Sequence, residues 1–254
     1  MIFFNSRKPK RSYGCKPDPV DHRDYRFRDL AGGTRQTEKL PDRYSLVTAS
    51  LTPRDQGQTS ACTGFAFAQA AECAFAWSGL LTGDLSPAFA YSIGRMQSGT
   101  AHSDVGSCNR DVIKAAIRYG IAHETACPFS VRGINKTPSA KAYADAYSRR
   151  GVRGYYRLGL KDYDSVKRAL YMGFPIVAEF ELDAPFENYN GKGIVQAPTG
   201  QILGRHALSI VGYERTTFKI VNSWGMSWGD EGFASVSYEW LASGANAWAL
   251  KLTP

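Results

Sequence analysis

The chain has 254 residues, of which 43% are hydrophobic and 13% aromatic, and its formal net charge is +8 at pH 7. This composition excludes a disordered chain and favours a globular protein with a substantial core. The basic residues are scattered and no nucleic-acid-binding motif accompanies them, so we predict a solvated basic surface and no nucleic-acid partner. No stretch approaches the roughly 18 consecutive apolar residues of a membrane span, so we expect no membrane partner.

Residues 1–40 are polar and have neither helical nor strand periodicity. We therefore expect an N-terminal arm that packs on the rest of the chain through Tyr25 and Phe27. The sequence turns basic after only a few apolar residues, which is not typical of a signal peptide. The sequence does not decide between an arm that inhibits and one that is clipped.

The cysteines are odd in number and lack the CxxC spacing of zinc or redox sites. They are Cys15, Cys62, Cys73, Cys108 and Cys127. We therefore expect no disulfide framework, no metal site and no cofactor. Together with the N-terminal pattern, this favours a reducing compartment and a cytoplasmic location.

The stretch from Cys62 to about Trp77 is rich in helix formers and nearly apolar on all sides, which predicts a buried helix. Cys62 would lie at its N-terminus, where the helix dipole and unpaired amides favour an anion. Such positions typically lower a thiol pKa to about 3.5 to 7.5.

Two more helices are predicted before residue 125. Ser86 and Pro87 are typical of an N-cap followed by proline at the first helical position, and residues 111–119 form a helix that Gly120 would end. The rest of the chain is predicted to be mostly sheet. It contains a capped helix at 164–170 and strands at 175–180, 206–213, 218–221, 232–238 and 247–252.

Four residues suffice for acyl transfer. The Cys62 thiolate would attack a carbonyl carbon while His206 carries protons. Asn222 would hold the imidazole in its useful tautomer, and Gln56 would donate a hydrogen bond to the developing oxyanion.

The sequence around these residues resembles the papain family of cysteine peptidases in three blocks. The first has Arg54-Asp55-Gln56-Gly57 followed by Ala61-Cys62, the second is GRHALSIVGY at 204–213, and the third is NSWGMSWGDEGF at 222–233. The blocks have the family's order, and the distances from Cys62 to His206 and Asn222 fall in or near the family's range of roughly 130 to 150 residues.

The resemblance covers about residues 40–252 and implies the papain-like two-lobed α+β fold. The peptidase domain would be residues 41–254. Its helical lobe, about 55–125, would carry the Cys62 helix, and its antiparallel, β-barrel-like lobe, about 126–254, would carry His206 and Asn222. The active-site cleft would lie between the two lobes.

The resemblance also assigns substrate-binding residues. Gly106 and Ser107 fall where the family has a glycine pair whose backbone pairs with an extended substrate, and Ser107 departs from that pattern. Glu179 falls near the pocket that sets specificity, where an acid could favour a basic or polar side chain two residues before the cleaved bond. Trp224 is also assigned to the substrate-binding residues. It would pack over the hydrogen bond between His206 and Asn222 and exclude water from it. Thr63 replaces a tryptophan of secreted relatives.

The arm and cysteines indicate the subclass. Secreted relatives usually carry a disulfide cysteine at the position of Thr59, and the stretch Asp21-His22-Arg23-Asp24-Tyr25 is similar to short-armed relatives from bacteria and their viruses. The resemblance therefore implies a short-armed bacterial or phage-type member, with association with a virion as an alternative to a free cytoplasmic location.

The function predicted is hydrolysis of peptide bonds in a protein or peptide substrate, through an acyl-enzyme on Cys62. Two alternatives stay open at this point. One is a catalytically idle, papain-fold structural or binding component of a larger assembly such as a virion. The other is acyl transfer or cleavage of a cell-wall peptide by the same nucleophile.

Overall fold

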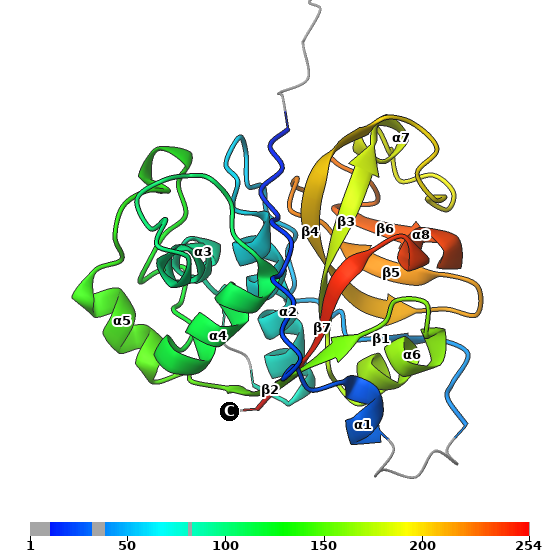
Figure 1. Ribbon diagram of the computed structural model, residues 1–254, viewed down its shortest axis with the longest axis horizontal. Coiled ribbons are helices and arrows are strands. Elements are labelled where there is room, and N and C mark those ends of the chain that lie inside the picture. The colour runs from blue at the N-terminus through cyan, green and yellow to red at the C-terminus, as the bar shows by residue number, and fades with distance from the viewer. Residues whose placement is uncertain (1–10, 32–38, 81–82, 254) are drawn as a thin grey trace, which may run out of the picture.

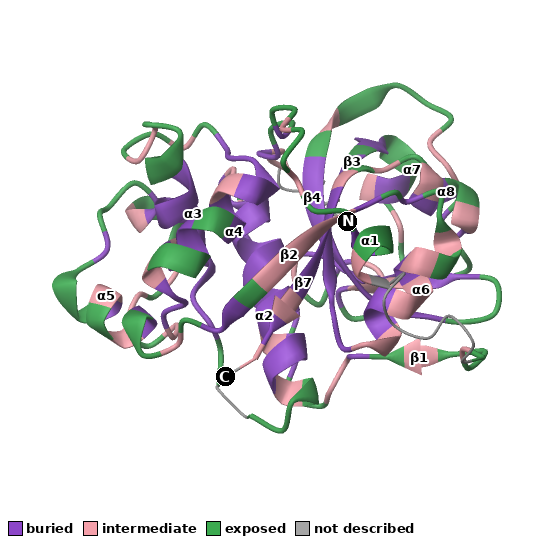
Figure 2. Cartoon of the chain, turned by 60° about the horizontal axis from the view of Figure 1, so that its bottom comes forward, coloured by how far each residue is buried: buried purple, intermediate pink, exposed green. Residues whose placement is uncertain are grey.

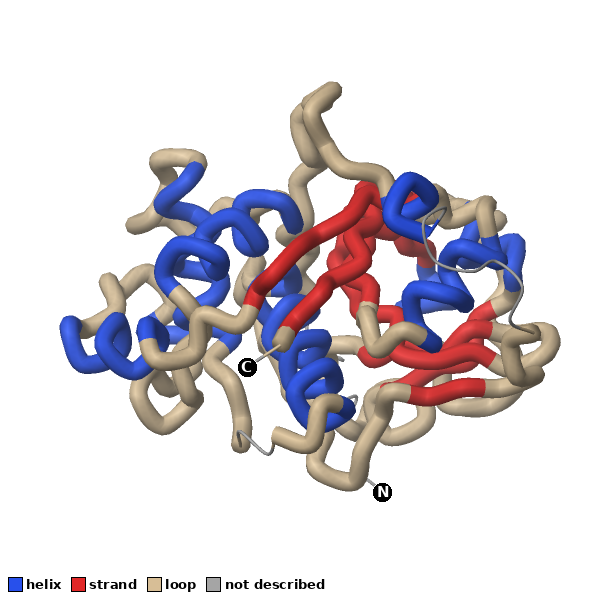
Figure 3. The backbone as a smooth tube through the Cα atoms, turned by 90° about the horizontal axis from the view of Figure 1, so that it is seen from below, coloured by secondary structure: helices blue, strands red, loops and turns tan. Residues whose placement is uncertain are grey.

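A computed structural model describes residues 11–31, 39–80 and 83–253. Helices gather on one side of the molecule and a sheet on the other, with helix α2 (Cys62–Trp77) between them (Figures 1 and 3). This is the two-lobed α+β arrangement that the sequence predicts.

Helix α2 is the centre of the packing. Thirteen of its sixteen residues are buried, because it contacts helix α3 (Pro87–Gln97) on one side and strand β4 (Ile202–Tyr213) on the other. A Cβ at Gly64 would lie 2.4 Å from the Pro87 carbonyl oxygen, so the close crossing of α2 and α3 requires glycine there. The prediction of a buried helix is confirmed.

The other helices begin and end for local reasons. The Ser86 side chain caps α3 by accepting a hydrogen bond of 2.9 Å from the Phe89 amide, as predicted. Helix α4 (Asn109–Tyr119) begins two residues before its predicted start and ends at Gly120, whose φ is 84°. Helix α5 (Ala140–Tyr147), which the sequence did not predict, lies beyond residue 125 on the helical side (Figure 1).

The sheet has strand order β2-β7-β3-β4-β5-β6, with β1 paired to β4. Every pair of neighbouring strands is antiparallel. The remaining strands are β1 (Tyr44–Ser45), β2 (Val152–Leu158), β3 (Ile176–Asp183), β5 (Phe218–Val221), β6 (Phe233–Val236) and β7 (Ala245–Leu252). The middle of the sheet and α2 are buried together (Figure 2).

Short helices cover the part of the sheet away from α2. They are α1 (Phe27–Ala31), α6 (Tyr163–Tyr171), α7 (Ala184–Glu187) and α8 (Tyr238–Ala242), and the 3-10 turn Val131–Gly133 lies outside this group. An aromatic stack fills the space beneath them, with Phe180 and Trp240 ring centroids 4.1 Å apart and Phe186 and Trp240 centroids 5.4 Å apart.

The N-terminal arm attaches differently from the prediction. Phe27 is fully buried and its ring packs against Tyr156 and Phe174. Tyr25, however, is 77% exposed, and it attaches through its backbone carbonyl, which accepts a hydrogen bond from the Arg157 amide. Because α1 begins at Phe27, the chain turns between the two rings and they do not share a side. The prediction that Tyr25 anchors the arm is therefore wrong.

Candidate active site

Cys62 is the first residue of α2 and is fully buried. The backbone N–H groups of Ala207 and Gly14 lie near its sulfur and favour the thiolate. Ala207 follows His206 on β4, and the Ser209 hydroxyl on the same strand donates to the Ala66 carbonyl of α2 at 2.6 Å. These contacts hold the histidine strand against the start of the cysteine helix.

His206 and Asn222 form a hydrogen bond of 2.9 Å between Nε2 and Oδ1. The backbone N–H of Ser223 also donates to Asn222 Oδ1, at 2.7 Å, which identifies that atom as the amide oxygen. His206 Nε2 must therefore carry the proton, and Nδ1 keeps its lone pair. Nδ1 has no hydrogen-bond partner among the described residues, so it can accept a proton.

The Trp224 ring covers this pair. Its centroid lies 4.8 Å from that of the His206 imidazole, and the tryptophan is fully buried. A hydrogen bond shielded from water in this way is electrostatically stronger than an exposed one.

Gln56 is fixed at both ends of its amide. Its Oε1 accepts a hydrogen bond of 2.6 Å from the Ser223 hydroxyl, and its Nε2 donates to the Thr59 carbonyl at 2.7 Å. The second proton of Nε2 points to the carbonyl oxygen of Ser12, 3.3 Å away. Gln56 therefore presents a donor to a carbonyl, which is the contact an oxyanion stabiliser makes.

Two supporting residues were not found from the sequence. Ser223 orients Gln56, as above, and Gln69 Nε2 donates to the Asn222 backbone carbonyl at 3.1 Å. Gln69 lies seven residues after Cys62, and this spacing places both side chains on the same face of α2. Its amide in an otherwise apolar stretch of the helix was the signal that could have identified it.

The expected substrate-pairing wall lies beside the start of α2. Gly106, with φ 78°, donates its amide to the Tyr91 hydroxyl, whereas the Ser107 amide donates to the Gly14 carbonyl at 3.0 Å. The hydroxyls of Ser107 and Thr63 share a buried hydrogen bond of 2.6 Å. The two residues that depart from the family pattern are therefore bonded to each other.

The segment 11–18, here called the strap, runs between the helical side and the sheet side of the molecule (Figure 1, dark blue). Besides the Gly14 contacts, its Cys15 amide donates to the Arg205 carbonyl at 3.2 Å and its Tyr13 hydroxyl donates to Glu187 at 2.8 Å. The Tyr13 ring meets the His206 ring edge-on, with centroids 6.3 Å apart. Beneath the strap, Cys62, His206 and Gln56 have no exposed surface.

This burial determines the protonation states. Desolvation raises the pKa of Cys62 to about 11, against the lowering effect of the amides around its sulfur, and it lowers the pKa of His206 to about 4. At pH 7 both groups are neutral in this form. The predicted low thiol pKa is therefore not found with the strap in place, because loss of water outweighs the field of the helix terminus.

Residues 42–246 match the family described as papain family cysteine protease. The chain is a member of the papain family. A peptidase C1-like protein of Acanthamoeba polyphaga mimivirus is 31% identical over 217 residues, which are 79% of this chain and 70% of that protein. Peptidase 1 of Euroglyphus maynei is 27% identical over 209 residues, and the aligned region covers only 60% of its length.

The papain-like fold is confirmed by solved structures. Xylellain, a cysteine protease from Xylella fastidiosa, has a TM-score of 0.81 and 26% identity, and the alignment covers 98% of both chains. A Carica candamarcensis cysteine protease in complex with E-64 has a TM-score of 0.68 at 21% identity and shows the same fold. The chain is thus a papain-family cysteine peptidase, as the sequence blocks predicted.

Glu179 lies inside this papain-family structure, not on its surface. It is 3% exposed, pairs with Arg205 at 3.3 Å, and accepts a hydrogen bond of 2.8 Å from Asn246. Burial raises the pKa of its carboxyl group, and the thiol of Cys15 in the strap is close enough to interact with its charge.

None of the described helices is long and apolar enough to cross a membrane. Within the described ranges, no group of three or more His, Cys, Asp or Glu side chains could hold a metal ion. All five cysteines are free thiols, and Cys73 is buried within α2.

Proposed function

We propose that this chain hydrolyses peptide bonds of protein or peptide substrates through an acyl-enzyme on Cys62. The observation that carries the proposal is the His206–Asn222 hydrogen bond, since it fixes the imidazole tautomer whose Nδ1 can take the thiol proton. The direct test is mass-spectrometric detection of peptide products from a peptide library, compared with the Cys62→Ala variant.

The proposed steps use only residues of this chain. His206 Nδ1 accepts the Cys62 proton, and the thiolate attacks the substrate carbonyl carbon. The oxyanion receives hydrogen bonds from Gln56 Nε2 and the Cys62 backbone amide. His206 then protonates the leaving amine, and afterwards it accepts a proton from the water that hydrolyses the thioester.

The proposed activity requires displacement of the strap. The Ser12 carbonyl accepts the second hydrogen bond of Gln56 Nε2, and the Gly14 amide lies near the Cys62 sulfur. A substrate carbonyl group would have to occupy both positions, with its oxygen beside Gln56 Nε2 and its carbon beside the Cys62 sulfur. The form described is therefore a closed state, and turnover depends on the fraction of molecules in which the strap has moved away.

We also propose the short-armed subclass and the specificity pocket. The match to xylellain extends over 98% of both chains and so includes most of residues 1–40. Glu179 would border the pocket for the side chain two residues before the cleaved bond. Arg205 and Asn246 already bind the Glu179 carboxylate. A basic substrate side chain in this pocket would have to share the carboxylate with them, so the preference for basic side chains should be modest.

Ser223 should act as a positioning residue for Gln56. Ser223→Ala removes the hydroxyl that holds Gln56 Oε1, so we expect kcat to fall by about tenfold while KM changes little, since the contact matters most when the oxyanion forms. Steady-state kinetics on one peptide substrate, in a variant whose strap is open, would measure both.

A double-mutant cycle separates this role from a general loss of stability. Gln56→Ala and the Gln56→Ala/Ser223→Ala double variant should have the same kcat, because Ser223 acts only through Gln56. Ser78→Ala, at the far end of α2, is the matched control and should leave kcat unchanged. Additive losses in the double variant would contradict the assignment.

A further inference from the structure

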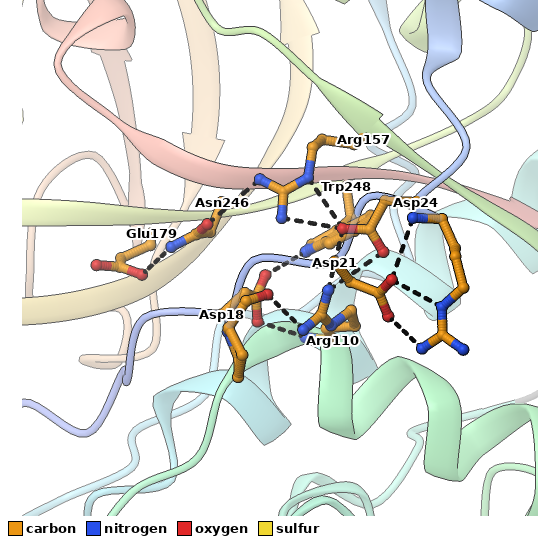
Figure 4. A network of polar contacts seen from close by, with 10 residues as sticks. Asp18, Asp21, Asp24, Arg110, Arg157, Glu179, Asn246 and Trp248 are labelled. Carbon is orange, nitrogen blue, oxygen red and sulfur yellow. Dashed lines mark hydrogen bonds and ion pairs between the residues drawn. The ribbon is translucent and has the colours of Figure 1, made fainter.

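Two carboxylates attach the arm to the body of the protein between the catalytic residues and Phe27. Asp18 Oδ2 accepts a hydrogen bond of 2.6 Å from Trp248 Nε1, and Asp18 Oδ1 accepts one of 3.0 Å from the Arg110 amide. The Asp24 side chain is 6% exposed and pairs with Arg110 at 3.0 Å and with Arg157 at 3.1 Å. Figure 4 shows these groups converging on one cluster.

Arg110 is the residue common to these attachments. Its amide holds Asp18 at the end of the strap, while its guanidinium donates to the Pro19 carbonyl and to the Asp24 carboxylate. The side chain of Arg110 is 6% exposed, so these are desolvated, charge-assisted hydrogen bonds, which are stronger than exposed ones.

The two halves of the molecule both contribute to this cluster. Arg110 comes from α4 on the helical side, whereas Arg157 and Trp248 come from β2 and β7 of the sheet. The Arg157 guanidinium also lies over the Trp248 ring, 4.8 Å from its centroid. The end of the strap is therefore held across the boundary between the lobes.

The exposed ion pair in the same stretch makes a useful contrast. Arg23 bonds Asp21 at 2.8 Å, but the Arg23 side chain is 88% exposed. Exposed pairs of this kind contribute little to stability. Of the charged side chains in the stretch 21–25, Asp24 is the one that pairs with both lobes.

The arm stays tethered when the strap leaves the cleft. Phe27 is buried in the core, and the Tyr25 carbonyl holds the Arg157 amide at 2.8 Å. Between Asp18 and Asp24, Val20 is 84% exposed and Pro19 is exposed as well, so this stretch has no apolar burial to lose on opening. Opening therefore needs no break in the chain.

We propose that Arg110 is the clasp of an intramolecular, reversible strap: its contacts to Asp18, Pro19 and Asp24 keep residues 11–18 over Cys62, and their release opens the cleft without cleavage of the chain. This proposal rests on the proposed peptidase function, since the strap regulates the same site. The clasp can be tested separately from the peptidase function, because the position of the strap can be measured without any turnover.

The test is the Arg110→Gln substitution in the full chain, which removes the guanidinium contacts to Pro19 and Asp24 and keeps the backbone amide on Asp18, with Arg23→Gln as the matched control. We expect alkylation of Cys62 by iodoacetamide, followed by peptide mapping, to become about tenfold faster or more, since a hydrogen bond to a charged group typically contributes at least that factor. Peptide turnover should rise by the same factor, intact mass should stay unchanged, and Arg23→Gln should behave as the parent chain.

Asp18→Ala provides a second route if Arg110→Gln does not fold, because Asp18 belongs to the strap and water can reach Trp248 Nε1 once the strap opens. Unchanged Cys62 alkylation in a folded Arg110→Gln or Asp18→Ala chain would overturn the clasp. Acceleration only after loss of N-terminal mass would overturn reversible opening. Faster alkylation without turnover in any variant would leave the clasp standing and refute the peptidase function.

Discussion

Replacing Cys62 with alanine should reduce peptide turnover to background, and His206→Ala should do the same. Removal of a nucleophile or its base typically costs about 10⁴-fold or more in kcat. Both residues are fully buried, and the substitutions remove atoms without adding any, so the fold should be retained. Product formation should be followed by mass spectrometry and the fold by circular dichroism, in the parent chain and in a variant whose strap is open.

Cys73→Ala is the matched control for the nucleophile. Cys73 is a buried thiol on the same helix and packs in the core of the sheet side, so its loss should lower stability slightly and leave kcat unchanged. Equal turnover by the Cys62→Ala and parent chains would mean that another group performs the chemistry.

Replacing Gly14 with leucine should activate the full chain. A Cβ at Gly14 would lie 1.9 Å from the Ser60 carbonyl oxygen and 2.4 Å from its carbon, and both are backbone atoms that cannot rotate away. The strap must therefore leave the cleft, whereas the catalytic residues keep their own contacts. We expect turnover to rise by about tenfold or more, because the clash destabilises the closed position of the strap. Gly159→Leu, at an open position, should have no such effect.

The same variant should change the pH dependence of Cys62 alkylation. With the strap in place, burial raises the pKa of Cys62 to about 11, so the thiolate fraction and the alkylation rate keep rising as the pH approaches that value. When water returns, the desolvation that raises the pKa is lost, and the rate should level off at a lower pH, near the ordinary thiol value of about 8.5 or below it. Coinciding pH profiles for Gly14→Leu and the parent chain would show that the strap does not control the thiol.

The sequence predicted most of what local chemistry determines. The apolar stretch from Cys62 marked the buried helix, and Ser86 and Gly120 marked helix ends that the structure contains. Strand β2 was missed because most of its residues are half-buried, which leaves no alternating pattern to read. The structure also brings Gln56, Cys62, His206 and Asn222 to one place, although the residues that orient them, Ser223 among them, carried no separate signal.

The strap could not be predicted, because it depends on contacts between segments far apart in the chain. Gly14 meets Ser107 and Cys62, and Asp18 meets Trp248, 230 positions later. The pKa of Cys62 was predicted in the wrong direction for the same reason. The helix terminus is local and visible in the sequence, whereas the burial that overrides it is produced by the fold.

In the proposed mechanism, the acyl half of the substrate is bound covalently to Cys62 during each turnover. The most direct measurement is mass spectrometry of the Gly14→Leu chain, quenched with acid during turnover of a peptide ester and then digested and mapped. We expect the peptide containing Cys62 to carry the mass of the acyl half of the substrate, and this adduct to disappear when the substrate is exhausted. Turnover of the ester without an adduct on Cys62, or with one on another residue, would contradict this mechanism.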